Sequence, residues 1–146
     1  MTDAERLLRR AMQSAAAATF VGALLELALV DHVDGWRQWM AFAFAGLGLV
    51  ALVWAWRDPR RPVLRAVRAV SVVVAVGALS GIVLHGVGNA EFEREVKPNA
   101  STAEVAWGGL TGGNPFFAPG MLALAAALTA AATLRHPALD GARRSA

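Results

Sequence analysis

The chain has 146 residues, enough for one domain, and its composition is 56% hydrophobic and 17% charged. Soluble domains are nearer half apolar and a quarter charged, so the composition disfavours a soluble protein and indicates a membrane protein. Because there is no cysteine, disulfide frameworks, cysteine metal sites and thiol nucleophiles are excluded. The net charge is +3, but the basic clusters flank apolar runs, which disfavours nucleic acid as a partner and makes the lipid bilayer the expected one.

Four apolar runs are long enough to be transmembrane helices, each of which needs about 20 residues. They cover residues 11–33, 39–56, 64–88 and 116–134. The first run is interrupted by Glu26, and the second ends where Pro59 and Pro62 stop a helix. Before the fourth run, Asn114 and Pro115 have the pattern of an N-cap followed by proline at the first helical position.

The loop between the third and fourth runs, residues 89–115, is expected to be partly helical. The segment AEFEREV can continue the third helix beyond the membrane, and Pro98 then breaks it. Ser101 followed by Glu104 is a capping-box pattern, which predicts a short helix over 102–110.

These elements predict an all-α fold: an antiparallel four-helix transmembrane bundle that forms a single integral-membrane domain over residues 1–146. All but three of the 14 Lys and Arg residues, the exceptions being Arg37, Arg94 and Lys97, fall at the N-terminus, between the second and third runs, or at the C-terminus. The positive-inside rule therefore predicts that both termini are cytoplasmic. A composition rich in Ala, Val, Leu and Arg is typical of GC-rich bacteria, which predicts the bacterial cytoplasmic (inner) membrane.

A buried polar site is the main functional hypothesis. His85, Asn89 and Glu93 are four residues apart and stack along one helical face. Glu26 lies within the first apolar run, where a carboxylate costs roughly 2.5–3.5 kcal/mol on insertion scales and therefore suggests a function. We expect Glu26 to point into the bundle on a face shared with Gly22, and to meet His85 at a similar depth.

Such a site would suit a proton relay or a divalent metal, with His85, Glu26 and His32 as the metal ligands. The alternative is a hydrogen-bonded pair that fixes helix register. No close ligand motif such as HExxH is present, so the metal pattern is weak. Haem is disfavoured, because His32 and His85 form the single available pair and His32 lies outside the expected hydrocarbon region.

The sequence leaves three functions open. The first is a membrane protein that handles protons, a metal ion or a small polar ligand at the Glu26/His85 site. The second is a non-catalytic accessory or structural subunit of a membrane complex, in which the chain could also pair as a homodimer. The third is a small membrane enzyme with Glu26 and His85 as acid and base. There is no phosphate-binding loop, nucleophile elbow or triad pattern, which favours a non-enzymatic role.

Three segments, HGVGNAEFEREVKPN, LELALVDH and FFAPGMLAL, resemble those of small four-span bacterial membrane proteins of unassigned activity. The resemblance implies the four-span fold. It implies no activity and no functional residue.

Overall fold

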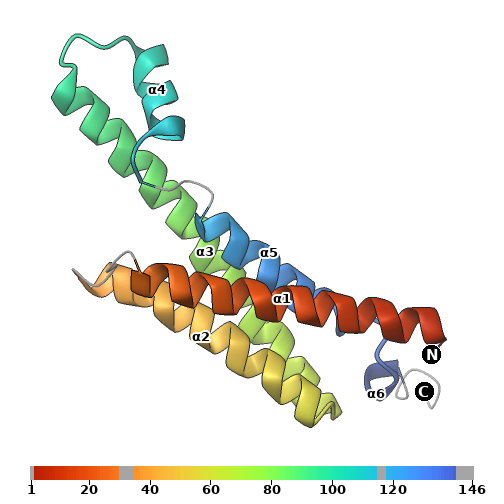
Figure 1. The fold of residues 1–146 in the computed structure, drawn as a ribbon. Coiled ribbons are helices and arrows are strands. Elements are labelled where there is room, and N and C mark those ends of the chain that lie inside the picture. The colour runs from red at the N-terminus through yellow and green to blue at the C-terminus, as the bar shows by residue number, and fades with distance from the viewer. Residues whose placement is uncertain (1, 30–34, 115–117, 141–146) are drawn as a thin grey trace.

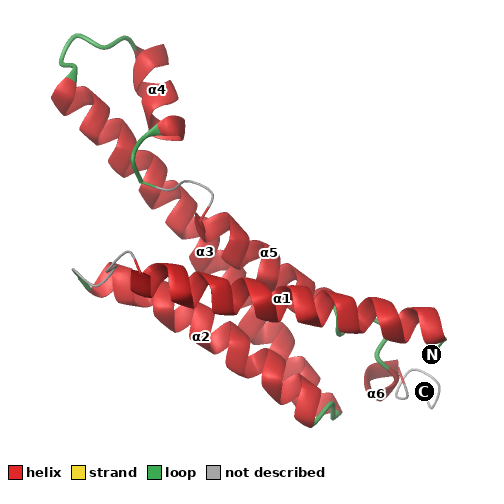
Figure 2. Cartoon of the chain, viewed as in Figure 1, coloured by secondary structure: helices red, strands yellow, loops and turns green. Residues whose placement is uncertain are grey.

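The structure, a computed structural model, describes residues 2–29, 35–114 and 118–140, and every regular element within these ranges is a helix (Figures 1 and 2). The helices are α1 (Asp3–Leu29), α2 (Trp36–Arg57), α3 (Arg61–Val96), α4 (Thr102–Thr111), α5 (Ala118–Ala131) and α6 (Pro137–Asp140). The predicted all-helical fold is therefore confirmed at this level.

The ends of the helices follow from local sequence. At the start of α1, the Thr2 hydroxyl accepts a hydrogen bond from the Glu5 N–H, and the Glu5 carboxylate accepts one from the Thr2 N–H. Helix α2 ends before Pro59, and Pro62 lies in the first turn of α3, where its missing N–H has no helical partner to lose.

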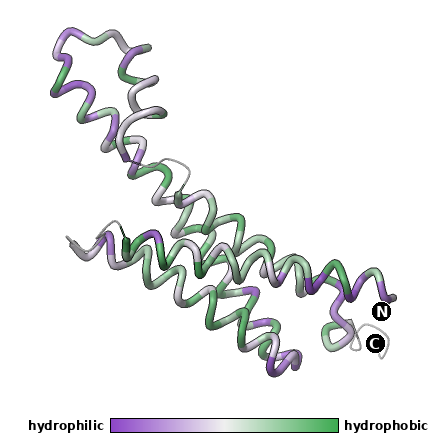
Figure 3. Tube along the Cα trace, in the orientation of Figure 1, coloured by the Kyte–Doolittle hydropathy of each residue, from purple (hydrophilic) through white to green (hydrophobic). Residues whose placement is uncertain are grey.

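Three helices, α1, α2 and α3, are long and apolar enough to cross a membrane. Figure 3 shows hydrophobic residues along the bundled helices, with hydrophilic residues at the N-terminal end of α1, at the α2–α3 turn and near the end of α3. The chain is therefore a helical membrane protein. The described part of helix α5 has 14 residues, or about 21 Å, and it ends at Ala131, three residues before the end of the fourth run that the sequence predicts.

The four long helices pack through small residues. Helix α5 packs along both α3 and α1, while α2 packs against α1 and α3. Phe20 is completely buried, and a Cβ added to Gly48 would lie 2.3 Å from its ring, so Gly48 leaves the space that the ring occupies. A Cβ added to Gly77 would likewise lie 2.3 Å from the ring of Phe44, so Gly77 leaves space for that ring. As predicted, the glycines of α3 serve close helix packing.

The face of α1 that carries Glu26 was predicted wrongly. Ala16 and Phe20 form the buried face of α1, whereas Gly22 and Glu26 are exposed on its other side. A Cβ added to Gly22 would meet no atom within 4 Å. The reason is that α1 uses its alanine-rich face, and not its glycine, to pack against α2 and α5.

Helix α3 is far longer than a membrane span. Its 36 residues extend over about 54 Å, compared with a hydrocarbon core of about 30 Å. The predicted extension by AEFEREV is confirmed, as is the short helix after Ser101, which is α4. Residues 86–114, which we call the α3–α4 arm, project away from the other helices in Figure 1.

Candidate functional site

The α3–α4 arm is built around one buried amide. Asn89 is 3% exposed and lies on the side of α3 that faces α4. Its side-chain Nδ2 donates hydrogen bonds to the carbonyl oxygens of Gly109 (3.4 Å) and Asn114 (3.2 Å). Its Oδ1 accepts a hydrogen bond of 2.9 Å from the Asn114 N–H. A single side chain therefore holds both the end of α4 and the segment that follows it against α3.

Glycines let α4 approach α3 closely enough for this bonding. A Cβ on Gly112 would lie 2.5 Å from Cγ of Asn89, and a Cβ on Gly108 would lie 2.8 Å from Cγ of Glu93. A Cβ on Gly109 would lie 3.2 Å from the carbonyl oxygen of Gly86. Neither Gly108 nor Gly112 can therefore carry a side chain without moving its neighbour.

Both ends of the turn between α3 and α4 are fixed by charged groups. Glu93 accepts a 2.7 Å hydrogen bond from Lys97 one helical turn on, and this bond raises the pKa of the Lys97 ammonium group. At the start of α4, Ser101 and Glu104 form the predicted capping box. The hydrogen bonds from the Ser101 N–H and hydroxyl lower the pKa of the Glu104 carboxyl.

The structure does not show the predicted buried site of Glu26, His85, Asn89 and Glu93. Among the described residues, no Cα of α1 lies within 8 Å of a Cα of α3, so the helices that carry Glu26 and His85 are not closely packed against each other. Glu26 is exposed, His85 is half-buried, and Asn89 bonds to the backbone of the arm. His32 lies outside the described residues.

The described residues also hold no group of three or more His, Asp or Glu side chains that could bind a metal ion. Glu93, the fourth predicted residue, is turned to Lys97 and lies against Gly108. Asn89 and Glu93, one turn apart on the continuous helix α3, both lie against α4.

Sequence analysis missed the role of the glycines. Gly108 and Gly109 lie inside α4, as the helix predicted over 102–110 implies, and Gly112 caps its end. The spacing of four between Gly108 and Gly112 is the pattern that marks a close helix contact, and it could have predicted the packing against α3.

No protein family, curated protein or solved structure matches this chain. The class of the protein therefore follows from its own structure. It is a helical membrane protein whose third helix carries an ordered helical arm beyond the bundle.

Proposed function

We propose that the protein is an accessory subunit of a membrane complex, which presents the α3–α4 arm to a protein partner at the membrane surface. The observation that supports this most is the buried Asn89 amide with its three backbone hydrogen bonds. An arm that is already ordered loses less conformational entropy on binding than a flexible loop of the same length. A loop of this length usually has a function, and order of this kind suits recognition.

The arm also carries the type of residue that protein interfaces use. Trp107 is 67% exposed on α4, and Phe92 is 61% exposed near the end of α3. Aromatic side chains are enriched at the energetic centres of interfaces. In contrast, the described residues of the bundle do not bring Glu26 and His85 together, so we do not favour ion or proton handling at that pair.

The proposal includes a membrane topology. We take α5 as the fourth span, antiparallel to α3, with both termini in the cytoplasm and the arm on the outer side of a bacterial inner membrane. The distribution of Lys and Arg supports this orientation. The contact of Arg68, near the start of α3, with Thr133, beyond the end of α5, supports the antiparallel pairing, and so does the contact of Gly81 with Pro119.

Photo-crosslinking in native membranes tests the proposed partner. With the photoreactive residue benzoylphenylalanine in place of Trp107, we expect one defined adduct with a second protein. The same residue in place of Leu47, an exposed residue of α2, is the control and should give no such adduct. Introducing Asn89→Leu together with the position-107 probe should abolish the adduct, because α4 is no longer held against α3.

Three results would contradict the accessory role. The first is the same adducts from positions 47 and 107, which would indicate unspecific capture. The second is an adduct that survives Asn89→Leu. The third is an adduct between two copies of this chain, which would show self-association through the arm.

A further inference from the structure

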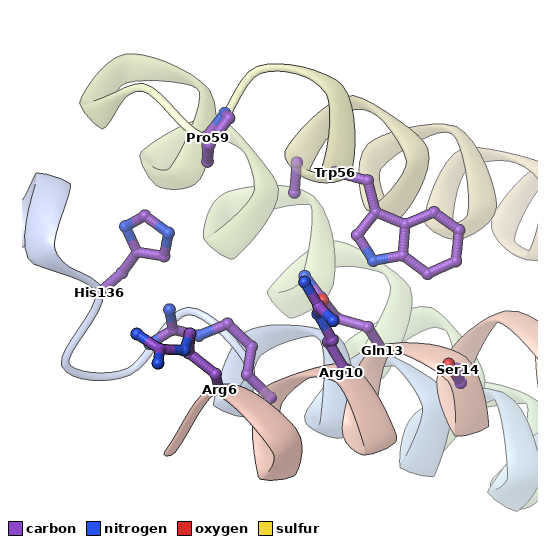
Figure 4. Close-up of a pocket in the computed structure, with 9 residues that line it drawn as sticks. Arg6, Arg10, Gln13, Ser14, Trp56, Pro59 and His136 are labelled. Carbon is purple, nitrogen blue, oxygen red and sulfur yellow. The ribbon is translucent and has the colours of Figure 1, made fainter. Parts of the chain in front are cut away.

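A basic pocket lies at the end of the bundle remote from the α3–α4 arm. It is an open surface pocket of about 480 Å³, bordered by the first turns of α1, the end of α2, the α2–α3 turn and the segment that leads into α6. Figure 4 shows Arg6 and Arg10 extending from α1 towards the α2–α3 turn, with His136 on one side and Trp56 on the other. The function that we propose for the α3–α4 arm does not involve this pocket.

The walls of the pocket are rich in cationic groups. Arg6, Arg9, Arg10 and His136 all contribute to the lining, and no Asp or Glu side chain does so among the described residues. Near its mouth, Asp3 forms an ion pair with Arg6 and offsets part of the charge. The pocket therefore retains a positive potential and favours an anionic ligand.

Hydrogen bonds fix the groups at the mouth of the pocket. Arg9 donates to the carbonyl oxygens of Leu134 (3.2 Å) and Arg135 (3.5 Å), which ties the segment after α5 to α1. Nδ1 of His136 accepts a 3.2 Å hydrogen bond from the Ala138 N–H, so in the neutral ring the proton is on Nε2, which is a donor. Arg9 thus fixes the wall of the pocket, while guanidinium and imidazole N–H groups in general match the oxygens of a phosphate group.

Along α1 the lining changes from charged to neutral polar. Arg6, Arg10, Gln13 and Ser14 follow one another on one side of the helix, and Arg6 and Ser14 are separated by about 12 Å along its axis. Ala55 and Trp56 of α2 add apolar surface to the lining. The lining therefore combines cations, neutral polar groups and apolar surface, which are the groups that would contact the phosphate, glycerol ester and acyl chains of a phospholipid.

The position of the pocket relative to the bilayer also fits a lipid. Trp56 is half exposed at the end of an apolar helix, where tryptophan typically marks the headgroup level of a membrane. Leu7 and Leu8 on the adjoining turns of α1 are largely exposed and offer apolar surface beside the cations. Basic pockets between transmembrane helices at this level are known to bind anionic headgroups.

We infer that this pocket binds an anionic phospholipid, with its phosphate at Arg6, Arg10 and His136 and its glycerol region at Gln13 and Ser14. Free phosphate shares the headgroup chemistry but would leave the polar and apolar part of the pocket unfilled. The inference depends on the membrane class of the protein and is independent of any partner of the arm.

Native mass spectrometry of the full chain in detergent, titrated with phosphatidylglycerol, tests the inference. Phosphatidylcholine with the same acyl chains is the lipid control, and it should bind more weakly. Arg10→Gln should weaken phosphatidylglycerol binding about five-fold, since one cation near a membrane phosphate contributes about 1 kcal/mol. Arg10→Lys should retain more affinity than Arg10→Gln, because it keeps the charge but loses the planar donor pair.

Arg65→Gln is the matched protein control, because Arg65 is an exposed cation of α3 that does not line the pocket. It should leave the affinity unchanged. Arg9 is not a suitable test position, since it also holds the backbone after α5.

Three outcomes would overturn the inference. The first is an equal loss of phosphatidylglycerol affinity in Arg65→Gln, which would indicate diffuse surface attraction, and the second is equal binding of the two lipids. The third is displacement of the lipid by inorganic phosphate at comparable concentration, which would assign the pocket to a free anion. Unchanged thermal unfolding of each variant verifies that the fold is retained.

Discussion

Asn89 shows how one polar residue can organise a segment of more than twenty residues. Its buried amide bonds three backbone groups, at Gly109 and Asn114, and leaving a buried amide of this kind unpaired would cost about 1–3 kcal/mol per group. Within the described part of the chain, no buried side-chain nitrogen or oxygen lacks a hydrogen-bond partner. Asn89 is therefore best understood as a structural residue that positions α4.

Glu26, unlike Asn89, is a polar residue that the structure leaves exposed. It lies on α1, outside the face that buries Ala16 and Phe20, and the helix that carries it is not closely packed against α3 in the described part of the chain. We predict that Glu26→Gln and His85→Gln have additive effects on thermal stability, with a coupling energy below about 0.5 kcal/mol. A double-mutant cycle measures this quantity, and a coupling of 1 kcal/mol or more would show that the two residues interact.

The sequence was informative about individual residues only where their partners are local. The Ser101–Glu104 capping box joins residues three apart, and it was predicted correctly. The partners of Asn89 lie 20 and 25 residues along the chain, and no spacing rule identifies them. The side of α1 that is buried could not be inferred either, because alanine, glycine and threonine all suit a helix contact.

At the scale of the element, glycine positions decide how closely helices approach. Gly48 and Gly46 both lie in α2, but a Cβ on Gly48 would collide with the ring of Phe20, whereas a Cβ on Gly46 would meet nothing within 4 Å. Alanine substitutions at the two positions therefore separate the effect of packing on stability from the effect of helix propensity.

We predict that Gly48→Ala destabilises the bundle by about 1–3 kcal/mol, because Phe20 is completely buried and cannot move aside freely. Gly46→Ala should instead stabilise the protein by up to about 1 kcal/mol, as expected for alanine in an open helical position. Thermal unfolding in detergent micelles measures both changes. Equal effects of the two substitutions would show that the Phe20–Gly48 contact does not govern α1–α2 packing.

The lengths of the elements were predicted best where the sequence changes from apolar to charged. The extension of α3 through Val96 follows from a run of good helix formers that ends before Pro98. The start of α1 at Asp3 was missed by counting apolar residues alone, because the charged first turns are helical outside the apolar run. A hydropathy pattern locates the membrane-spanning part of a helix, and it does not locate the ends of the helix.

At the scale of the whole molecule, the two ends of the bundle differ in character. One end carries the basic pocket formed with Arg6 and Arg10, and from the other end the α3–α4 arm projects. The two features are far apart along the helices, so lipid binding at the pocket and partner binding at the arm can be tested separately.

The proposed topology can be measured directly, because the chain has no cysteine and each introduced thiol is unique. We predict that Glu95→Cys, on the arm, reacts with a membrane-impermeant maleimide in cells with a permeable outer barrier and an intact inner membrane. Arg61→Cys, at the start of α3, should react only after the inner membrane is opened. The reverse pattern would invert the topology, and reaction of both thiols before opening would contradict a spanning α3.

Helix α4 docks on α3 within the single chain, and the hydrogen bonds of Asn89 hold it there. Hydrogen–deuterium exchange of the full chain in lipid nanodiscs tests this most directly, with Asn99→Leu, at an exposed position of the α3–α4 turn, as the control. We predict protected amides in the second half of α4 in the wild type and in Asn99→Leu, and exchange at least about 30-fold faster there in Asn89→Leu, corresponding to a loss of about 2 kcal/mol. Exchange of α4 at the rate of an unfolded peptide in the wild-type protein, or equal protection in Asn89→Leu, would contradict the claim.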